Sequence, residues 1–180
     1  MPNRNETASA LAAAFALAAD GRAVFPMTFA KRPACAHGVH DASRDPAVIR
    51  LFAARGAALV AIATGTPSGI AVLDVDRQHG GAAWWREHGG QLPRTFAYRS
   101  WSGGMHLWFL HRPGLRTCVL SEGVERRAEG ARAIFWPAAG LPILSDADPA
   151  PWPIRLEPPP PPAWRPPPAA SSSPPCRRRR

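Results

Sequence analysis

The feature that most constrains the fold is a pair of apolar runs separated by a turn rich in glycine. The first run is Leu59 to Ala63, and the second is Ile70 to Val75, which is apolar apart from Asp74. Segments this short with almost no polar residue are typical of strands that are covered on both faces. The pair therefore predicts two neighbouring strands in the interior of a sheet.

The remaining periodicity predicts helices on either side of that sheet. We expect helices over residues 5–20, 45–56 and 82–88, and further strands over 23–25, 94–101, 105–111, 119–128 and 132–136. Residues 26–44 have no period and are typical of a loop. The sequence thus predicts an α+β domain over residues 6–148, with a mixed or antiparallel sheet flanked by helices.

The C-terminal part of the chain has a different composition. Residues 151–180 hold 12 of the 22 prolines and six arginines against the single acid Glu157, so this segment carries +5 of the formal net charge of +9. Such a composition cannot bury a core, and we expect residues 149–180 to form a disordered, extended tail. The remaining +4 is a modest charge that suits a phosphate-rich partner.

Cysteine usage and hydropathy exclude several classes of protein. The chain has three cysteines at wide spacing, which supports neither a disulfide framework nor a four-cysteine zinc site. The run from Cys35 to His40 has only three candidate ligands, so we predict no zinc. No stretch reaches the roughly 18 apolar residues of a membrane span. We expect a cytoplasmic protein with no membrane partner.

Two carboxylates follow the second apolar run. The two-residue period of a strand places Asp74 and Asp76 on one face, side by side where the strand leaves the core. Paired carboxylates repel each other, and a divalent cation such as Mg²⁺ relieves that repulsion. Taken alone, the pattern also fits a helix cap or a phosphohydrolase site.

The order of short motifs along the chain narrows these alternatives. They are Thr64-Gly65-x-x-Ser68-Gly69, Leu73-Asp74-Val75-Asp76, Gly80-Gly81, Leu92-Pro93-x-Thr95 and Ser102-Gly103-Gly104-Met105-His106. As an ensemble, they resemble the bifunctional primase-polymerase N-terminal domain family of the archaeo-eukaryotic primase superfamily. The resemblance covers roughly residues 8–140 and implies a primase-like α+β fold.

The resemblance also implies a set of site residues. The first family motif falls on Asp74 and Asp76, and the third falls on Glu125, where the family usually has aspartate, with Glu129 as a second candidate. By this resemblance Asp74, Asp76 and Glu125 are the catalytic and metal-binding acids, for Mg²⁺ or Mn²⁺. The nucleotide-binding residues would be the second motif, comprising Ser102, Gly103, Gly104 and His106, together with Lys31, which is the single lysine of the chain.

The activity that this resemblance implies is template-dependent nucleotidyl transfer, as primer synthesis, DNA polymerisation or both. The partners would be a DNA template and primer, nucleoside triphosphates and a separate helicase. Two alternatives stay open at this point. One is a catalytically weakened nucleic-acid or nucleotide-binding module of the same fold, and the other is a metal-dependent phosphohydrolase.

Overall fold

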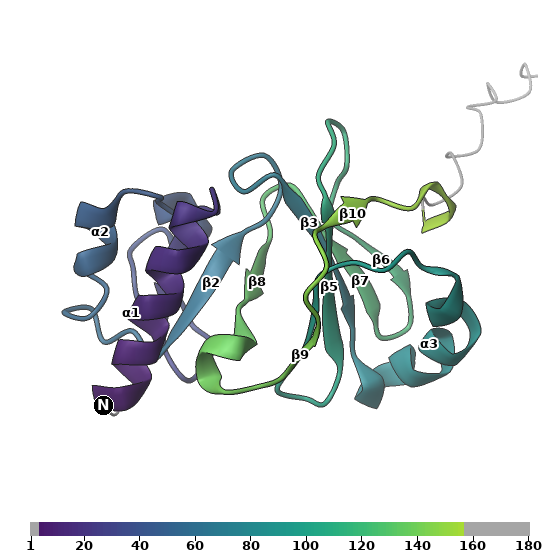
Figure 1. The fold of residues 1–180 in the computed structure, drawn as a ribbon, viewed down its shortest axis with the longest axis horizontal. Coiled ribbons are helices and arrows are strands. Elements are labelled where there is room, and N and C mark those ends of the chain that lie inside the picture. The colour runs from purple at the N-terminus through teal and green to yellow at the C-terminus, as the bar shows by residue number, and fades with distance from the viewer. Residues whose placement is uncertain (1–3, 157–180) are drawn as a thin grey trace, which may run out of the picture.

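The computed structural model describes residues 4–156, and these residues form two antiparallel sheets between helices (Figure 1). The larger sheet has the strand order β6-β7-β3-β5-β4-β9. Its strands are β3 Ile70–Val75, β4 Ala97–Arg99, β5 Met105–Leu110, β6 Cys118–Ser121, β7 Val124–Arg127 and β9 Ile143–Ser145, and β10 Ala150–Pro151 pairs in parallel with the end of β5. The smaller sheet has the order β1-β2-β8, with β1 Val24–Met27, β2 Leu59–Ala63 and β8 Arg132–Ile134.

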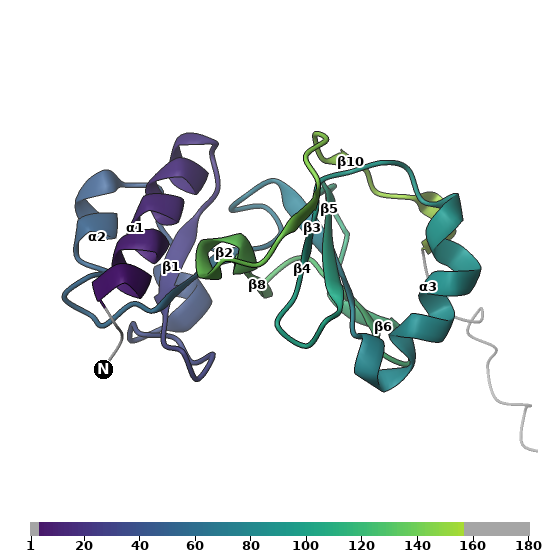
Figure 2. The ribbon, with the colours of Figure 1, turned by 60° about the horizontal axis from the view of Figure 1, so that its bottom comes forward.

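Helices lie on the outer side of each sheet. Helices α1 Arg4–Ala19 and α2 Pro46–Arg50 lie beside the smaller sheet, and α3 Ala82–His88 lies at the opposite end of the molecule, beside the larger sheet (Figure 2). Short helical turns connect the elements: η1 Gly38–Asp41, η2 Arg77–Gly81, η3 Gly89–Gln91, η4 Trp136–Ala139 and η5 Ile154–Leu156. The predicted α+β class with antiparallel sheets is confirmed. None of the helices in the described residues 4–156 is both long and apolar enough to cross a membrane.

Strand β3 contributes to two hydrophobic cores. Ile70 and Val72 pack with the smaller sheet and its helices, whereas Leu73 and Val75 pack on the opposite face, on the side of α3. This alternation is the two-residue period of a strand. Asp74 shares the face of Ile70 and Val72, as the sequence predicts, and therefore points toward the smaller sheet.

The prediction that the two apolar runs form neighbouring strands is wrong. Strand β2 pairs with β1 and β8, whereas β3 pairs with β5 and β7, so the two runs lie in different sheets. The turn between them has Gly65 and Gly69 at φ 90° and 65°, conformations that favour glycine. These residues let the chain leave one sheet and enter the other. Burial on both faces was foreseen, but the strand partners depend on segments far along the chain.

The predicted beginning of the tail is also too early. Residues 150–151 form β10 and residues 154–156 form η5, and the Trp152 ring packs edge-on against Phe109 with centroids 5.3 Å apart. Trp152 is buried, so this segment gains apolar burial that its proline content did not suggest. The rest of the predicted tail, residues 157–180, lies outside the described residues.

Candidate active site

Four side chains form a row across the larger sheet. In the antiparallel register, Asp74 of β3 lies opposite Glu125 of β7 on one side and His106 of β5 on the other, and His106 lies opposite Tyr98 of β4. Directly opposed residues on antiparallel strands point to the same face. The sheet thus brings two predicted acids and the predicted histidine together from three segments spread over about fifty residues.

Tyr98 holds His106 in place. The Tyr98 hydroxyl lies 3.1 Å from His106 Nδ1, donates to the Ile134 carbonyl at 3.0 Å and accepts from the Trp108 indole at 3.4 Å. Burial, the largest effect, and the negative charge of Asp74 raise the pKa of the Tyr98 phenol far above its ordinary value. The phenol therefore stays neutral, and its hydroxyl holds the His106 imidazole through Nδ1.

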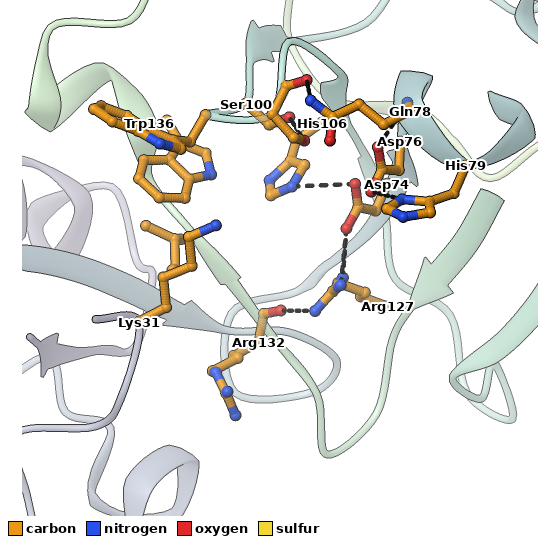
Figure 3. Close-up of a pocket in the computed structure, with 13 residues that line it drawn as sticks. Lys31, Asp74, Asp76, Gln78, His79, Ser100, His106, Arg127, Arg132 and Trp136 are labelled. Carbon is orange, nitrogen blue, oxygen red and sulfur yellow. Dashed lines mark hydrogen bonds and ion pairs between the residues drawn. The ribbon is translucent and has the colours of Figure 1, made fainter. Parts of the chain in front are cut away.

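Asp74 is held between a histidine and an arginine. Its Oδ1 lies 3.4 Å from His106 Nε2, and its Oδ2 lies 2.8 Å from Arg127 Nη2 and 3.0 Å from Arg127 Nε (Figure 3). Burial by itself disfavours the carboxylate, but the hydrogen bond and charge of His106 and the charge of Arg127 outweigh it, and the pKa of Asp74 is lowered. Asp74 is therefore ionised.

Glu125 and Asp76, the other two predicted acids, are also paired with neighbouring side chains. Arg127 Nη2 lies 3.0 Å from Glu125 Oε2, so one guanidinium bridges the carboxylates of Asp74 and Glu125. Asp76 caps the turn after β3: its Oδ1 accepts from the Gln78 backbone at 3.0 Å, and its Oδ2 lies 2.9 Å from His79 Nδ1. Within residues 4–156, no three His, Cys, Asp or Glu side chains are arranged to hold one metal ion.

A cleft of about 410 Å³ opens between the two sheets at this row. Its lining includes five predicted site residues and several that were not predicted: Lys31, Asp74, Asp76, Gln78, His79, Ser100, Trp101, Ser102, His106, Arg127, Arg132, Ile134 and Trp136. Glu125 lines an adjoining hollow of about 310 Å³ that shares Asp74, Asp76, His79 and Arg127 with the cleft. The third predicted acid thus lies beside the cleft and is paired with Arg127.

Gly103 and Gly104 are not among the residues that line the cleft, and their nucleotide-binding role stays a prediction. Gly103 has φ 80° in the turn between β4 and β5. A Cβ on Gly104 would lie 2.2 Å from the Val75 carbonyl oxygen, so the absence of a side chain lets the turn pack on the end of β3. Ser102 in the same turn does line the cleft.

Lys31 lies across the cleft from the acids, beside Trp136 (Figure 3). Its Nζ lies 5.4 Å from the Trp136 ring centroid, within the range of a cation–π contact. The Lys31 backbone has φ 60°, which is uncommon for a residue other than glycine and is frequent at functional sites. The single lysine of the chain is thus held where it faces the cleft.

Glu129, the second candidate for the third acid, is not part of this row. Its carboxylate accepts from the Thr66 backbone at 3.0 Å and from the Thr66 hydroxyl at 2.8 Å, and it lies 3.2 Å from His111 Nε2. The hydrogen bond from the Thr66 backbone N–H lowers the pKa of Glu129 most, and the hydrogen bond from the Thr66 hydroxyl lowers it further. Glu129 stabilises the turn after β2, and of the two candidates only Glu125 lies opposite Asp74.

Three residues that define the site are not among the predicted site residues. Arg127 could have been found, because it follows Glu125 by two residues and so lies on the same face of one strand. His79 follows Asp76 by three residues, the spacing of one helical turn. Tyr98 left no signal, because its role depends on the pairing of β4 with β5.

The arrangement defines a class of protein: an α+β fold with an ionised carboxylate and a fixed histidine in a cleft lined by cationic side chains. Such a cleft suits a phosphate-bearing substrate. The family model described as bifunctional DNA primase/polymerase, N-terminal, matches residues 14–164 of the 180. The chain therefore belongs to this family, which implies nucleotidyltransferase-type activity in general. A comparison with curated proteins found no match.

Proposed function

We propose that the chain catalyses template-dependent nucleotidyl transfer, in which a 3′-hydroxyl attacks the α-phosphate of a nucleoside triphosphate. The observation that supports it most directly is the row of Glu125, Asp74 and His106 on adjacent strands at the edge of one cleft. The row takes one residue from each of the three motifs, in the order third, first and second across the sheet. A DNA template and primer and nucleoside triphosphates are the partners that this function requires.

The donor set fits the divalent metal that the family implies. Asp74, Asp76 and Glu125 offer only oxygen donors, the type that Mg²⁺ and Mn²⁺ prefer, and Asp74 and Asp76 line both hollows. These three residues would hold the metal once their carboxylates turn away from Arg127 and His79, because within residues 4–156 no three such groups converge on one point. When bound, the metal would neutralise the charge on the transferring phosphate and lower the pKa of the attacking hydroxyl.

The remaining side chains bind and orient the triphosphate. His106 lines the cleft and is held through Nδ1 by Tyr98, so its Nε2 lies beside Asp74 at the cleft wall. Lys31 supplies a positive charge from the opposite wall, and the Ser102 hydroxyl supplies a hydrogen bond. Groups held in position before the substrate arrives stabilise developing charge without reorganising.

One observation supports a second candidate, a binding module with weakened catalysis. The Arg127 guanidinium lies between Asp74 and Glu125, so it already neutralises two carboxylates that the metal would need. Glu125 also carries one methylene more than the aspartate usual in the family. If Arg127 holds this position with substrate bound, the chain would bind nucleotide and template without efficient transfer.

Primer extension separates these functions. The full chain would be incubated with Mn²⁺, labelled nucleotides and a primed template, beside Asp74→Asn and a control, Glu87→Gln. Glu87 is an exposed carboxylate of α3 outside both hollows, so its substitution tests for effects of charge alone. We expect extension by the wild type and the control, and a loss of at least about 100-fold in Asp74→Asn.

The other outcomes identify the alternatives. Binding of template and nucleotide without extension, in every variant, would support the module. Release of phosphate from triphosphate without template, lost in Asp74→Asn, would support the phosphohydrolase. Extension that is unchanged in Asp74→Asn would contradict the proposed site itself.

A further inference from the structure

Three aromatic rings from separate segments form a continuous row beside the cleft. They are Phe29 from the turn after β1, Trp101 from the turn between β4 and β5, and Trp136 at the beginning of η4. Phe29 meets Trp101 edge to face with centroids 5.8 Å apart, and Trp101 stacks on Trp136 at 6.0 Å and 30°. We call these three residues the aromatic row.

The aromatic row leads from the cleft to the outer surface. Trp136 is only 5% exposed, whereas Trp101 is 55% and Phe29 52% exposed. Trp101 and Trp136 line the cleft, but Phe29 does not, so the row extends beyond the space that the nucleotide-binding residues enclose. Large rings exposed side by side are unfavourable in water and are frequent at binding surfaces.

Positive charges accompany the aromatic row. Lys31 Nζ lies 5.4 Å from the Trp136 ring, and Arg132 lines the same cleft. Arg99 lies in β4 immediately before the turn that carries Trp101, and its Nη1 donates to the Gly103 carbonyl at 3.1 Å. Aromatic faces beside cations are the combination that binds single-stranded nucleic acid, because the rings stack with bases and the cations neutralise phosphates.

We propose that the aromatic row stacks with unpaired bases of the single-stranded template and guides the strand into the cleft. The inference rests on the proposed function, which requires a template that is read while unpaired. A duplex covers its base faces and could not stack on these rings. A single mononucleotide would not need Phe29, which lies outside the cleft. The flanking cations favour a polyanion over an apolar protein surface.

Strand binding can be measured without catalysis. The full chain carrying Asp74→Asn would be mixed, in the presence of a chelator, with a labelled single-stranded oligonucleotide, and the affinity read by fluorescence anisotropy. Trp101→Ala, Phe29→Ala and Trp101→Phe would be compared with Ile154→Ala. Ile154 is 83% exposed and lies in η5, so it controls for the loss of exposed apolar surface.

We expect Trp101→Ala to weaken binding roughly 5- to 100-fold, Phe29→Ala to weaken it less, and Trp101→Phe to keep most of the affinity. The salt dependence should be unchanged in Trp101→Ala, because no phosphate contact is removed. On an abasic strand of equal length, the parent and Trp101→Ala should bind alike.

Several outcomes would overturn the proposal. One is unchanged affinity for the single strand in Trp101→Ala. The others are a loss of affinity in Trp101→Ala that is equal for duplex and single strand, that is equal for the abasic and the normal strand, or that affects only free nucleoside triphosphate. Dimerisation through the aromatic row, reversed by Trp101→Ala without any effect on strand binding, would also overturn it. Because this assay needs no extension, a failure of the polymerase function would leave its result interpretable.

Discussion

Tyr98→Phe removes one hydroxyl from the point where the two sheets meet. The Tyr98 ring is fully buried, and its hydroxyl connects the Ile134 carbonyl of the smaller sheet with His106 and Trp108 of the larger one. Phenylalanine keeps the ring and creates no large cavity. The cost therefore comes from polar groups that lose their partner inside the protein.

The magnitude follows from the three contacts. An unsatisfied buried group costs about 1–3 kcal/mol, and the Ile134 carbonyl, at 3.0 Å, loses its bond to the hydroxyl outright. The indole contact is long at 3.4 Å, and His106 keeps its contact with Asp74, so each of these adds less. We expect a loss of roughly 2–4 kcal/mol in the free energy of unfolding.

Urea denaturation measures this loss, and alkaline pH tests its cause. Tyr98 is the single tyrosine of the chain, so tyrosinate absorbance reports on this residue alone. Because burial raises the folded pKa above the ordinary 10.0, the unfolded state loses its proton first. The stability contributed by the neutral phenol is therefore full below pH 10.0 and is lost as pH rises through the folded pKa. Above pH 10.0 the wild type should lose stability more steeply than Tyr98→Phe.

Two results would refute this reasoning. One is a change below about 0.5 kcal/mol in Tyr98→Phe, the size usual for a surface substitution. The other is tyrosinate that appears near pH 10.0 while the protein is still folded.

Two further predictions concern the turn after β4 and the arginine between the acids. Gly104→Ala should lower the free energy of unfolding, measured in urea, by about 1–3 kcal/mol, because its Cβ would meet a β3 carbonyl oxygen at 2.2 Å. The control Gly90→Ala has open space around its Cβ and should cost little. Equal losses of stability in the two variants would contradict this reasoning. Arg127→Gln should tighten Mn²⁺ binding, followed by the free-ion electron paramagnetic signal without nucleotide, on the order of 5-fold. Arg94→Gln is the control, because the Arg94 side chain is exposed. Unchanged or weaker Mn²⁺ binding in Arg127→Gln would show that the Arg127 guanidinium does not compete with the metal.

The strand face of the acids could be predicted because it depends only on local alternation. Asp74 shares its face with Ile70 and Val72 in the structure, as the two-residue period requires. The position of Asp45 before α2 is likewise local, since its side chain accepts from the Ala47 backbone at 2.8 Å as an N-cap. The face of Asp74 and the cap at Asp45 each depend only on residues a few positions away in the sequence.

The strand partners could not be predicted from local pattern. The sequence does not state that Glu125 lies opposite Asp74, or that β8 completes the sheet of β2, because these pairings join residues about fifty and about seventy positions apart. The inclusion of Trp152 in the core was missed for a similar reason. Its contact with Phe109 exists only once β10 lies beside β5. The chemical roles of the site residues stay predictions.

Strand β3 limits which insertions and deletions the gene can tolerate. Its side chains fill one core with Ile70 and Val72 and the other with Leu73 and Val75. A shift of one residue would turn Asp74 toward the interior beside α3 and would expose a leucine to the cleft. Such a shift would bury the Asp74 carboxylate without its partners and would put side chains of the wrong size into both cores, so it would destabilise the domain. Selection for stability alone therefore keeps the carboxylate aimed at the cleft, even in a copy whose chemistry is no longer needed.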